Sequence, residues 1–370
     1  MICLFYICII QDKFVIDGSY GRVGSLSDRL LQHIMKTYIV YEIIDPHDTA
    51  KGISMKHSLI RWAQSRLHIQ NIVSGLKEEA GSFERFPCIS NVQYGIQYPN
   101  SYLDIYYCDD RDTVHPLLFY VHGGGFVWGD KRSGDPGGTD DSFLWYIRRF
   151  LSEGFDFVSM NYAFSPDYGY PIPLLQMQEA ICFLQDNKNR YDISTDRIVF
   201  AGASAGGQLI GQFANVQTNP EYARFMKMQP CLKEDQIAAI LFNSTLFQTE
   251  KAGDTGTLWS NVLFKKCLQT YFDTKRLEND PVVISSGVLS YISDRFPSCF
   301  ISDGNTASFP DQAKQVSSVL DVYGIRHVLN IYPASEKTLL HGFENIDDEY
   351  GRDNMDKMIS FLHSLDLPSS

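Results

Sequence analysis

A serine framed by small residues is the first feature of the sequence that could do chemistry. Ser204 stands in Gly-Ala-Ser-Ala-Gly, directly after an apolar run that predicts a strand over Ile198–Ala201 and before a helical pattern over Ala205–Asn215. The two glycines allow a sharp turn from strand to helix, which exposes the serine hydroxyl above the edge of a sheet. We therefore expect Ser204 to act as a nucleophile.

Three consecutive glycines follow the predicted strand Leu117–Val121, in the run His-Gly-Gly-Gly-Phe. Acyl transfer creates an oxyanion, and fixed backbone N–H groups stabilise it well. We expect the N–H groups of Gly124, Gly125 and Ala205 to converge on that oxygen. A phosphate-binding turn is the alternative, but no Lys-Ser/Thr pair follows and the G-x-G-x-x-G spacing is absent. His122 belongs to the loop itself, and we expect a structural role for it.

A nucleophilic serine needs a base, and nine histidines are available: His33, His47, His57, His68, His115, His122, His327, His341 and His363. In strand–serine–helix hydrolases the chain order is serine, acid, histidine, so the base must come late and just beyond a strand. His341 follows a predicted strand and a polar loop and precedes the last helical segment. We expect it to be the base.

The acid should lie between the predicted strand Cys299–Ser302 and the helix that begins near Pro310. Asp303 comes directly after the strand, and Gly304 gives the loop freedom to turn. Asp311 is the alternative, although a carboxylate at that position also favours the start of a helix. We favour Asp303 and keep Asp311 open.

Together these motifs resemble the hormone-sensitive-lipase-like branch of the α/β-hydrolase superfamily. The resemblance rests on HGGGF, GASAGG, HGF and the run NYAFSP at residues 161–166, and it covers residues 95–365. It implies an esterase with an eight-stranded, mainly parallel sheet, a helical cap and no cofactor. It also implies that Ser204 is the nucleophile, that His341 is the base, and that the three backbone N–H groups form the oxyanion hole.

The sequence departs from this branch at two positions. The branch usually carries G-x-x-D-P-L after the strand of the acid, but here Gly-Asn-Thr-Ala stands, with Ala307 where the aspartate would align. The acid has therefore either shifted to Asp303 or left the triad imperfect. Ala203 precedes the nucleophile where the branch often has an acidic residue. This second departure bears on the assignment to a subfamily and not on the predicted catalytic chemistry.

Short apolar runs alternate with helical patterns after residue 95, which predicts a mostly parallel sheet covered on both faces. Strands are expected at Tyr102–Tyr107, Leu117–Val121, Phe155–Met160, Ile198–Ala201, Ala238–Phe242, Cys299–Ser302 and His327–Tyr332. Residues 1–94 predict a helical or cap segment, with helices at 25–41 and 57–68. Residues 95–370 form the expected catalytic domain. Within it, residues 220–280 interrupt the alternation of strands and helices and are expected to be a cap insertion.

Composition excludes several classes of protein. The 370 residues carry 32 basic and 44 acidic side chains, which gives a net charge of −12. This charge provides no general electrostatic attraction to nucleic acid or to an anionic membrane. The eight cysteines form no C-x-x-C pair or zinc-ligand spacing, which predicts reduced thiols, no metal and a cytoplasmic protein. The apolar residues 1–10 are too short for a stable membrane span; a buried strand or a ragged start of the chain is expected, and a degenerate signal segment is the alternative.

The sequence thus predicts a serine carboxylesterase that hydrolyses small or medium acyl esters through an acyl-enzyme intermediate. An amide-cleaving hydrolase, such as a peptidase or an arylformamidase, would use the same machinery. A non-catalytic protein that binds a small ligand on the same fold is a third reading. The expected partner is a small-molecule ester, and the oligomeric state is open.

Overall fold

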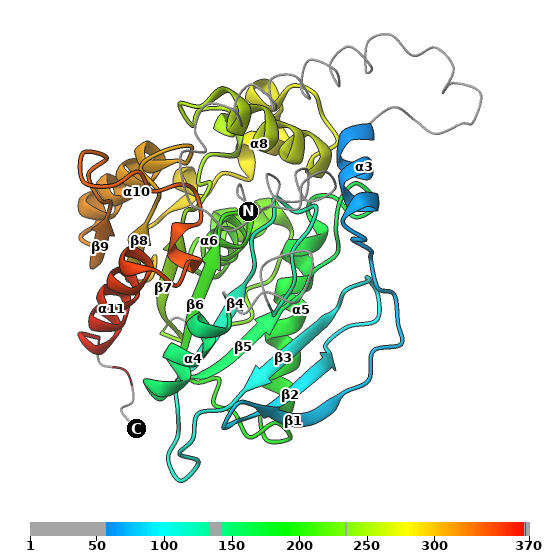
Figure 1. Cartoon of the computed structure of the whole chain (residues 1–370), viewed down its shortest axis with the longest axis vertical. Helices are drawn as coiled ribbons and strands as arrows, with labels where there is room; N and C mark the ends of the chain where they lie inside the picture. The colour runs from blue at the N-terminus through cyan, green and yellow to red at the C-terminus, as the bar shows by residue number, and fades with distance from the viewer. Residues whose placement is uncertain (1–56, 133–142, 234, 366, 368–370) are drawn as a thin grey trace, which may run out of the picture. The chain divides into compact units, whose positions relative to one another are not determined.

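The computed structural model describes residues 57–132, 143–233, 235–365 and 367. Within these ranges the strands form one nine-stranded sheet in the order β1-β2-β3-β5-β4-β6-β7-β8-β9 (Figure 1). The strands are β1 Glu79–Phe83, β2 Phe86–Gln93, β3 Tyr102–Tyr106, β4 Leu117–Val121, β5 Asp156–Met160, β6 Ile198–Ala203, β7 Ile237–Asn243, β8 Cys299–Ser302 and β9 His327–Asn330. The pairs from β1 to β5 are antiparallel, and those from β5 through β4 to β9 are parallel.

Helices cover both faces of this sheet, as the alternating pattern predicts. They are α3 Ser58–Arg66, α4 Leu144–Ser152, α5 Ile172–Asn187, α6 Ala205–Thr218, α7 Pro220–Met226, α8 Leu258–Tyr271, α9 Pro281–Ser285, α10 Pro310–Tyr323 and α11 Glu349–His363. In β6, Val199 and Ala201 pack with α4 and α11, whereas Phe200 points the other way and meets Phe213 of α6 at a ring distance of 5.5 Å. Strands β4 and β7 are apolar up to Asn243 at the end of β7, because they are buried on both faces.

The α/β fold predicted from the sequence is confirmed, with corrections. The sheet has nine strands and not eight, and β1 and β2 precede the expected domain boundary at residue 94. These two strands escaped prediction because β1 is largely exposed and β2 contains Pro87, so neither shows an apolar alternation. The expected helix at 25–41 and the apolar residues 1–10 lie outside the described residues.

The expected cap insertion at 220–280 is not continuous, because β7 runs through it in the middle of the sheet. After β7 the chain instead forms the helix α8 and four shorter helical segments: η2 Thr249–Lys251, η3 Leu277–Asn279, α9 and η4 Leu289–Tyr291. No helix in the described part of the chain is long and apolar enough to cross a membrane.

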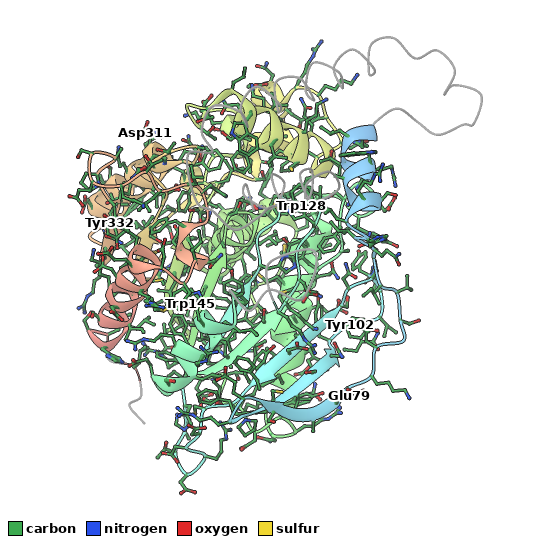
Figure 2. All side chains as sticks on the ribbon, in the orientation of Figure 1. Glu79, Tyr102, Trp128, Trp145, Asp311 and Tyr332 are labelled. Carbon is green, nitrogen blue, oxygen red and sulfur yellow. The ribbon has the colours of Figure 1, made fainter. Side chains whose placement is uncertain are left out.

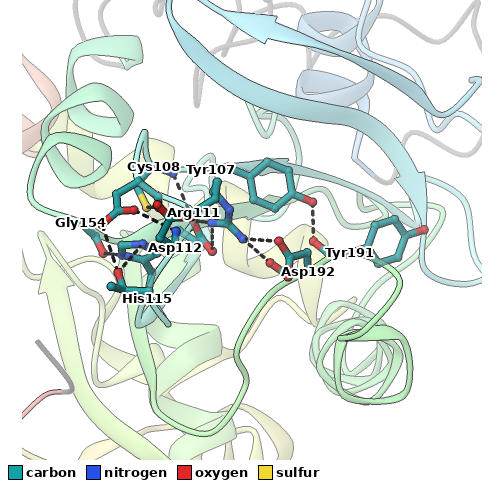
Figure 3. Close-up of polar contacts among 11 residues, drawn as sticks. Tyr107, Cys108, Arg111, Asp112, His115, Gly154, Tyr191 and Asp192 are labelled. Atoms are coloured by element: carbon teal, nitrogen blue, oxygen red, sulfur yellow. Dashed lines mark hydrogen bonds and ion pairs between the residues drawn. The ribbon is translucent and has the colours of Figure 1, made fainter. Parts of the chain in front are cut away.

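An ion-pair network holds the starting edge of the parallel strands (Figure 3). Arg111 Nη1 donates to both carboxylate oxygens of Asp156, the first residue of β5, at 2.7 and 2.8 Å. Its Nη2 lies 3.1 Å from an oxygen of Asp192, and its guanidinium covers the ring of Tyr107 at 4.8 Å. The residues predicted to do chemistry lie at the opposite edge, where the parallel strands end.

Candidate active site

Ser204 lies in the sharp turn between β6 and α6. Its backbone angles are φ 54° and ψ −114°, a conformation that costs a non-glycine residue about 1–3 kcal/mol and is found where a fold imposes it. The turn needs glycine at position 206, because a Cβ there would lie 2.0 Å from the carbonyl oxygen of Val121. Ser204 N donates to Asn243 O at 2.9 Å, which anchors the turn to β7. The hydroxyl is thereby presented at the carboxyl edge of the sheet.

His341 meets this serine from the loop after β9. Its Nε2 lies 2.8 Å from Ser204 Oγ. The ring packs against Phe264 of α8 at 4.8 Å and Phe309 at 5.6 Å between centroids. Burial lowers the pKa of His341 to about 3, so the imidazole is neutral at physiological pH and can accept the hydroxyl proton. The structure therefore brings together the nucleophile and the base predicted from the sequence.

Asp303, the favoured candidate acid, connects to His341 through a residue that the sequence did not indicate. Ser308 Oγ lies 2.7 Å from His341 Nδ1 and donates a short hydrogen bond to Asp303 Oδ1. Asp303 stands directly after β8, as the sequence predicts, and is fully buried. A triad acid ordinarily bonds the histidine itself, but here Ser308 stands between the two. Burial, and then the carboxylate of Glu344, raise the pKa of Asp303 well above its ordinary value.

The alternative acid, Asp311, lies at the surface at the start of α10 (Figure 2). Its side chain is 86% exposed and pairs with Lys314 at 3.0 Å. It stands in the first turn of α10, where a carboxylate favours the start of a helix, although Phe309 and not Asp311 holds the N-cap position. Of the two candidate acids, Asp303 is the one that the hydrogen bonds connect to His341, through Ser308.

Glu344 is a second residue that sequence reasoning missed. It is fully buried, and burial raises its pKa to about 7. Ser244 donates to it from the backbone N–H at 2.9 Å and from the hydroxyl, and Ser302 Oγ approaches at 3.2 Å. Gly342 N, next to His341, donates to the same Ser244 hydroxyl at 2.9 Å. Glu344 thus ties the histidine loop to the ends of β7 and β8.

The glycine loop after β4 abuts the nucleophile. Gly124 has φ +102°, and a Cβ there would lie 2.1 Å from the carbonyl oxygen of Trp128. A Cβ on Gly123 would come 3.3 Å from Cβ of Ser204. Among the described residues no atom accepts a hydrogen bond from Gly124 N or Gly125 N. As the first residue of α6, Ala205 adds an N–H group without an acceptor inside its helix.

His122 lies within this loop, as expected of a structural residue. Its ring stacks on Tyr162 at 4.3 Å, and its Nδ1–H donates to Gly123 O at 2.7 Å. Tyr162 Oη donates to the carbonyl oxygens of both residues at 3.0 Å. Burial lowers the pKa of His122 to about 4, which keeps its ring neutral. In the part of the chain that the structure describes, no group of three His, Cys, Asp or Glu could hold a metal ion.

The same fold occurs in solved esterases. Esterase B from Lactobacillus rhamnosis matches with a TM-score of 0.63 at 17% identity, covering 83% of this chain and 95% of its own. The esterase of Pyrobaculum calidifontis matches with a TM-score of 0.54 at 17% identity, covering 83% and 91%. The fold is therefore that of an α/β hydrolase.

The BD-FAE family model matches residues 103–309, and the chain belongs to that family. A protein of Acanthamoeba polyphaga mimivirus named as an alpha/beta hydrolase is 23% identical over 185 residues, 48% of this chain and 46% of its own length. An acetyl esterase of Salmonella schwarzengrund is 28% identical over 99 residues, 27% of this chain and 28% of its own. The chain thus spans less than half the length of these curated relatives.

Proposed function

We propose that the protein is a serine carboxylesterase that hydrolyses small or medium acyl esters. The observation that carries the proposal is the 2.8 Å contact between Ser204 Oγ and Nε2 of a buried, neutral His341. A hydroxyl held in a strained turn against a neutral imidazole is what nucleophilic catalysis requires. Membership of the BD-FAE family and the solved esterases of the same fold support the same chemistry.

The reaction would proceed in two balanced halves. Ser204 Oγ attacks the ester carbonyl carbon while its proton passes to His341 Nε2, and the carbonyl oxygen becomes an oxyanion. The N–H groups of Gly124, Gly125 and Ala205 stabilise that charge. The C–O bond to the alcohol then breaks, and the leaving oxygen takes the proton from Nε2. Water repeats the sequence on the acyl-enzyme and releases the acid.

Enclosure of the site favours a small or medium acyl group. Ser204 and His341 are only 8% and 5% exposed, with Phe264 packed on the imidazole. A Cβ on Gly125 would lie 2.9 Å from the side chain of Cys267, so α8 closes on the glycine loop. One relative is named an acetyl esterase, and a truncated carbohydrate esterase from gut microbiota shares the fold with a TM-score of 0.58.

The test is hydrolysis of p-nitrophenyl acetate, butyrate, octanoate and laurate by the parent and by Ser204→Ala. The matched control is Ser317→Ala, which also removes a serine hydroxyl bonded to a histidine, His327 at 2.8 Å, but on α10 away from the nucleophile. We expect the short esters to be preferred, the activity to vanish in Ser204→Ala and the control to match the parent. Full activity in Ser204→Ala, or faster cleavage of matched anilides than of esters, would refute the proposal.

A further inference from the structure

Three side chains form a continuous chain of hydrogen bonds behind the nucleophile. His341 Nδ1 lies 2.7 Å from Ser308 Oγ, and Ser308 Oγ donates to Asp303 Oδ1. When Asp303 is ionised, the Ser308 hydroxyl gives its single proton to the carboxylate, and its oxygen then accepts from Nδ1–H. Nε2 then carries no proton and can accept one from Ser204. The direction of these bonds fixes the tautomer that a general base needs.

We propose that Ser308 is a positioning residue through which Asp303 acts on His341, an inference that rests on the proposed esterase function. The hydroxyl takes the place that a carboxylate holds in an ordinary triad. No proton needs to reach Asp303 during the reaction: Nδ1–H stays on the ring, and only Nε2 gains and loses a proton. The positive charge that forms on His341 is stabilised by Asp303 through the oriented Ser308 dipole.

Burial makes this hydroxyl difficult to replace by solvent. Ser308 is 1% exposed and Asp303 is fully buried. Phe309, the next residue, packs edge-on against the ring of His341 at 5.6 Å. Without Ser308 Oγ, Nδ1–H would lose the acceptor that the structure gives it, and the ring would lose the bond that selects its tautomer.

Backbone bonds between two loops hold Ser308 at this distance. Thr306 N donates to Leu339 O at 3.0 Å, and Thr306 pairs with Leu340 in an isolated parallel bridge. The side chain of Asn305 accepts from Leu339 N at 3.1 Å and donates to Tyr332 O at 3.0 Å. The loop that carries Ser308 is therefore fixed to the one that carries His341.

Ala307 shows why a bridging residue is needed. It stands where the resembling branch has its aspartate, and it is 3% exposed with a left-handed φ of 54°. A methyl group offers the histidine no acceptor. The carboxylate instead comes from Asp303, four positions earlier, and Ser308 spans the gap between that carboxylate and Nδ1.

The kinetic test compares Ser308→Ala, Ser308→Thr and the control Ser317→Ala. We expect Ser308→Ala to lower kcat about 10²- to 10⁴-fold with KM changed less than threefold, the upper bound being the cost of a wrong tautomer in a known triad. Ser308→Thr keeps the hydroxyl and should recover at least tenfold of that loss. A kcat within threefold of the parent for Ser308→Ala, or no recovery with Thr when both variants unfold at the parent's temperature, would overturn the proposal.

Combining Ser308→Ala with Asp303→Asn tests whether the two residues act as one unit. If Asp303 acts through Ser308, the double variant should lose no more kcat than the more damaging single variant. Losses that multiply would mean that Ser308 and Asp303 act independently, which contradicts the proposal.

A substrate-free measurement separates this proposal from the esterase function. The proton on His341 Nδ1, shielded from exchange by burial, should give a low-field proton NMR signal in the parent and in Ser317→Ala. The signal should disappear in Ser308→Ala and return in Ser308→Thr. Its persistence in Ser308→Ala would refute the bridge even if the enzyme is an esterase, whereas its loss would support the bridge even if p-nitrophenyl esters are not cleaved.

Discussion

Glu344 and Ser244 form the support beneath the histidine loop. The glutamate accepts from the serine backbone N–H at 2.9 Å and from the serine hydroxyl at 2.8 Å. That hydroxyl in turn accepts from Gly342 N at 2.9 Å. A buried acid three residues after His341 thus fixes the backbone beside the proposed base.

The raised pKa of Glu344 makes its contribution to stability depend on pH. Its folded value of about 7 exceeds the ordinary 4.5, so the native state holds the proton more tightly. This contribution is fully present below the unfolded pKa and is lost as pH rises through 7. Relative to Glu344→Gln, the parent should lose up to about 3 kcal/mol of unfolding free energy between pH 4.5 and 8, measured by urea denaturation. Parallel pH curves for the two proteins would contradict this.

The acid limb of the pH–activity profile should lie at an unusually low pH. The base works only while His341 is neutral, and burial lowers its pKa from 6.5 to about 3. As pH falls, kcat/KM should therefore hold near its plateau through pH 6.5 and decline only at lower pH. The measurement is kcat/KM for an acetate ester from pH 4 to 9 in a constant-ionic-strength buffer. A limb centred near 6.5 would show that the imidazole is solvated in the free enzyme.

Gly124 should tolerate no side chain. Alanine there would place a Cβ 2.1 Å from Trp128 O and move the proposed oxyanion donor. We expect kcat to fall by about 10²- to 10³-fold with little change in KM. Gly324→Ala is the matched control, because Gly324 also has a positive φ of +66° but meets nothing within 4 Å. Equal kcat for Gly124→Ala and Gly324→Ala would argue against the oxyanion role of the loop.

Substitutions at the two candidate acids, Asp303 and Asp311, should have clearly different effects on kcat. Asp303→Asn removes the carboxylate that accepts from Ser308 and should lower kcat by orders of magnitude while KM changes much less. Asp311→Asn removes only an exposed ion pair with Lys314, so its cost should stay within about 1 kcal/mol of stability with kcat unchanged. Steady-state kinetics and thermal unfolding of both variants decide between them. The reverse ranking would move the acid to Asp311.

The elements that could be predicted from the sequence are those encoded by residues adjacent in the chain. The turn around Ser204 was predictable because small residues between a strand and a helix leave few other conformations. The strands β4 and β7 were equally clear, because burial on both faces makes them almost entirely apolar. By contrast, β1 is a mostly exposed edge strand and gave no pattern.

The parts of the site that escaped prediction depend on how loops pack. Asp303 was placed correctly after its strand, but nothing in its spacing indicated that Ser308 would stand between it and His341. The one available signal was Ala307, where the expected aspartate is missing. Glu344 is an acidic residue just after Gly342, and acidic residues are rarely fully buried. Its complete burial therefore could not be predicted from its residue type.

The most direct test of the central claim is covalent labelling by a fluorophosphonate, followed by mass spectrometry of the digested protein. A serine activated by the 2.8 Å contact with His341 should react stoichiometrically, and the adduct should map to the peptide that contains Ser204. Labelling should be lost in Ser204→Ala, slow strongly in His341→Gln and match the parent in Ser317→Ala. An unlabelled parent, or an adduct on any other residue, would contradict the assignment of Ser204 as the nucleophile.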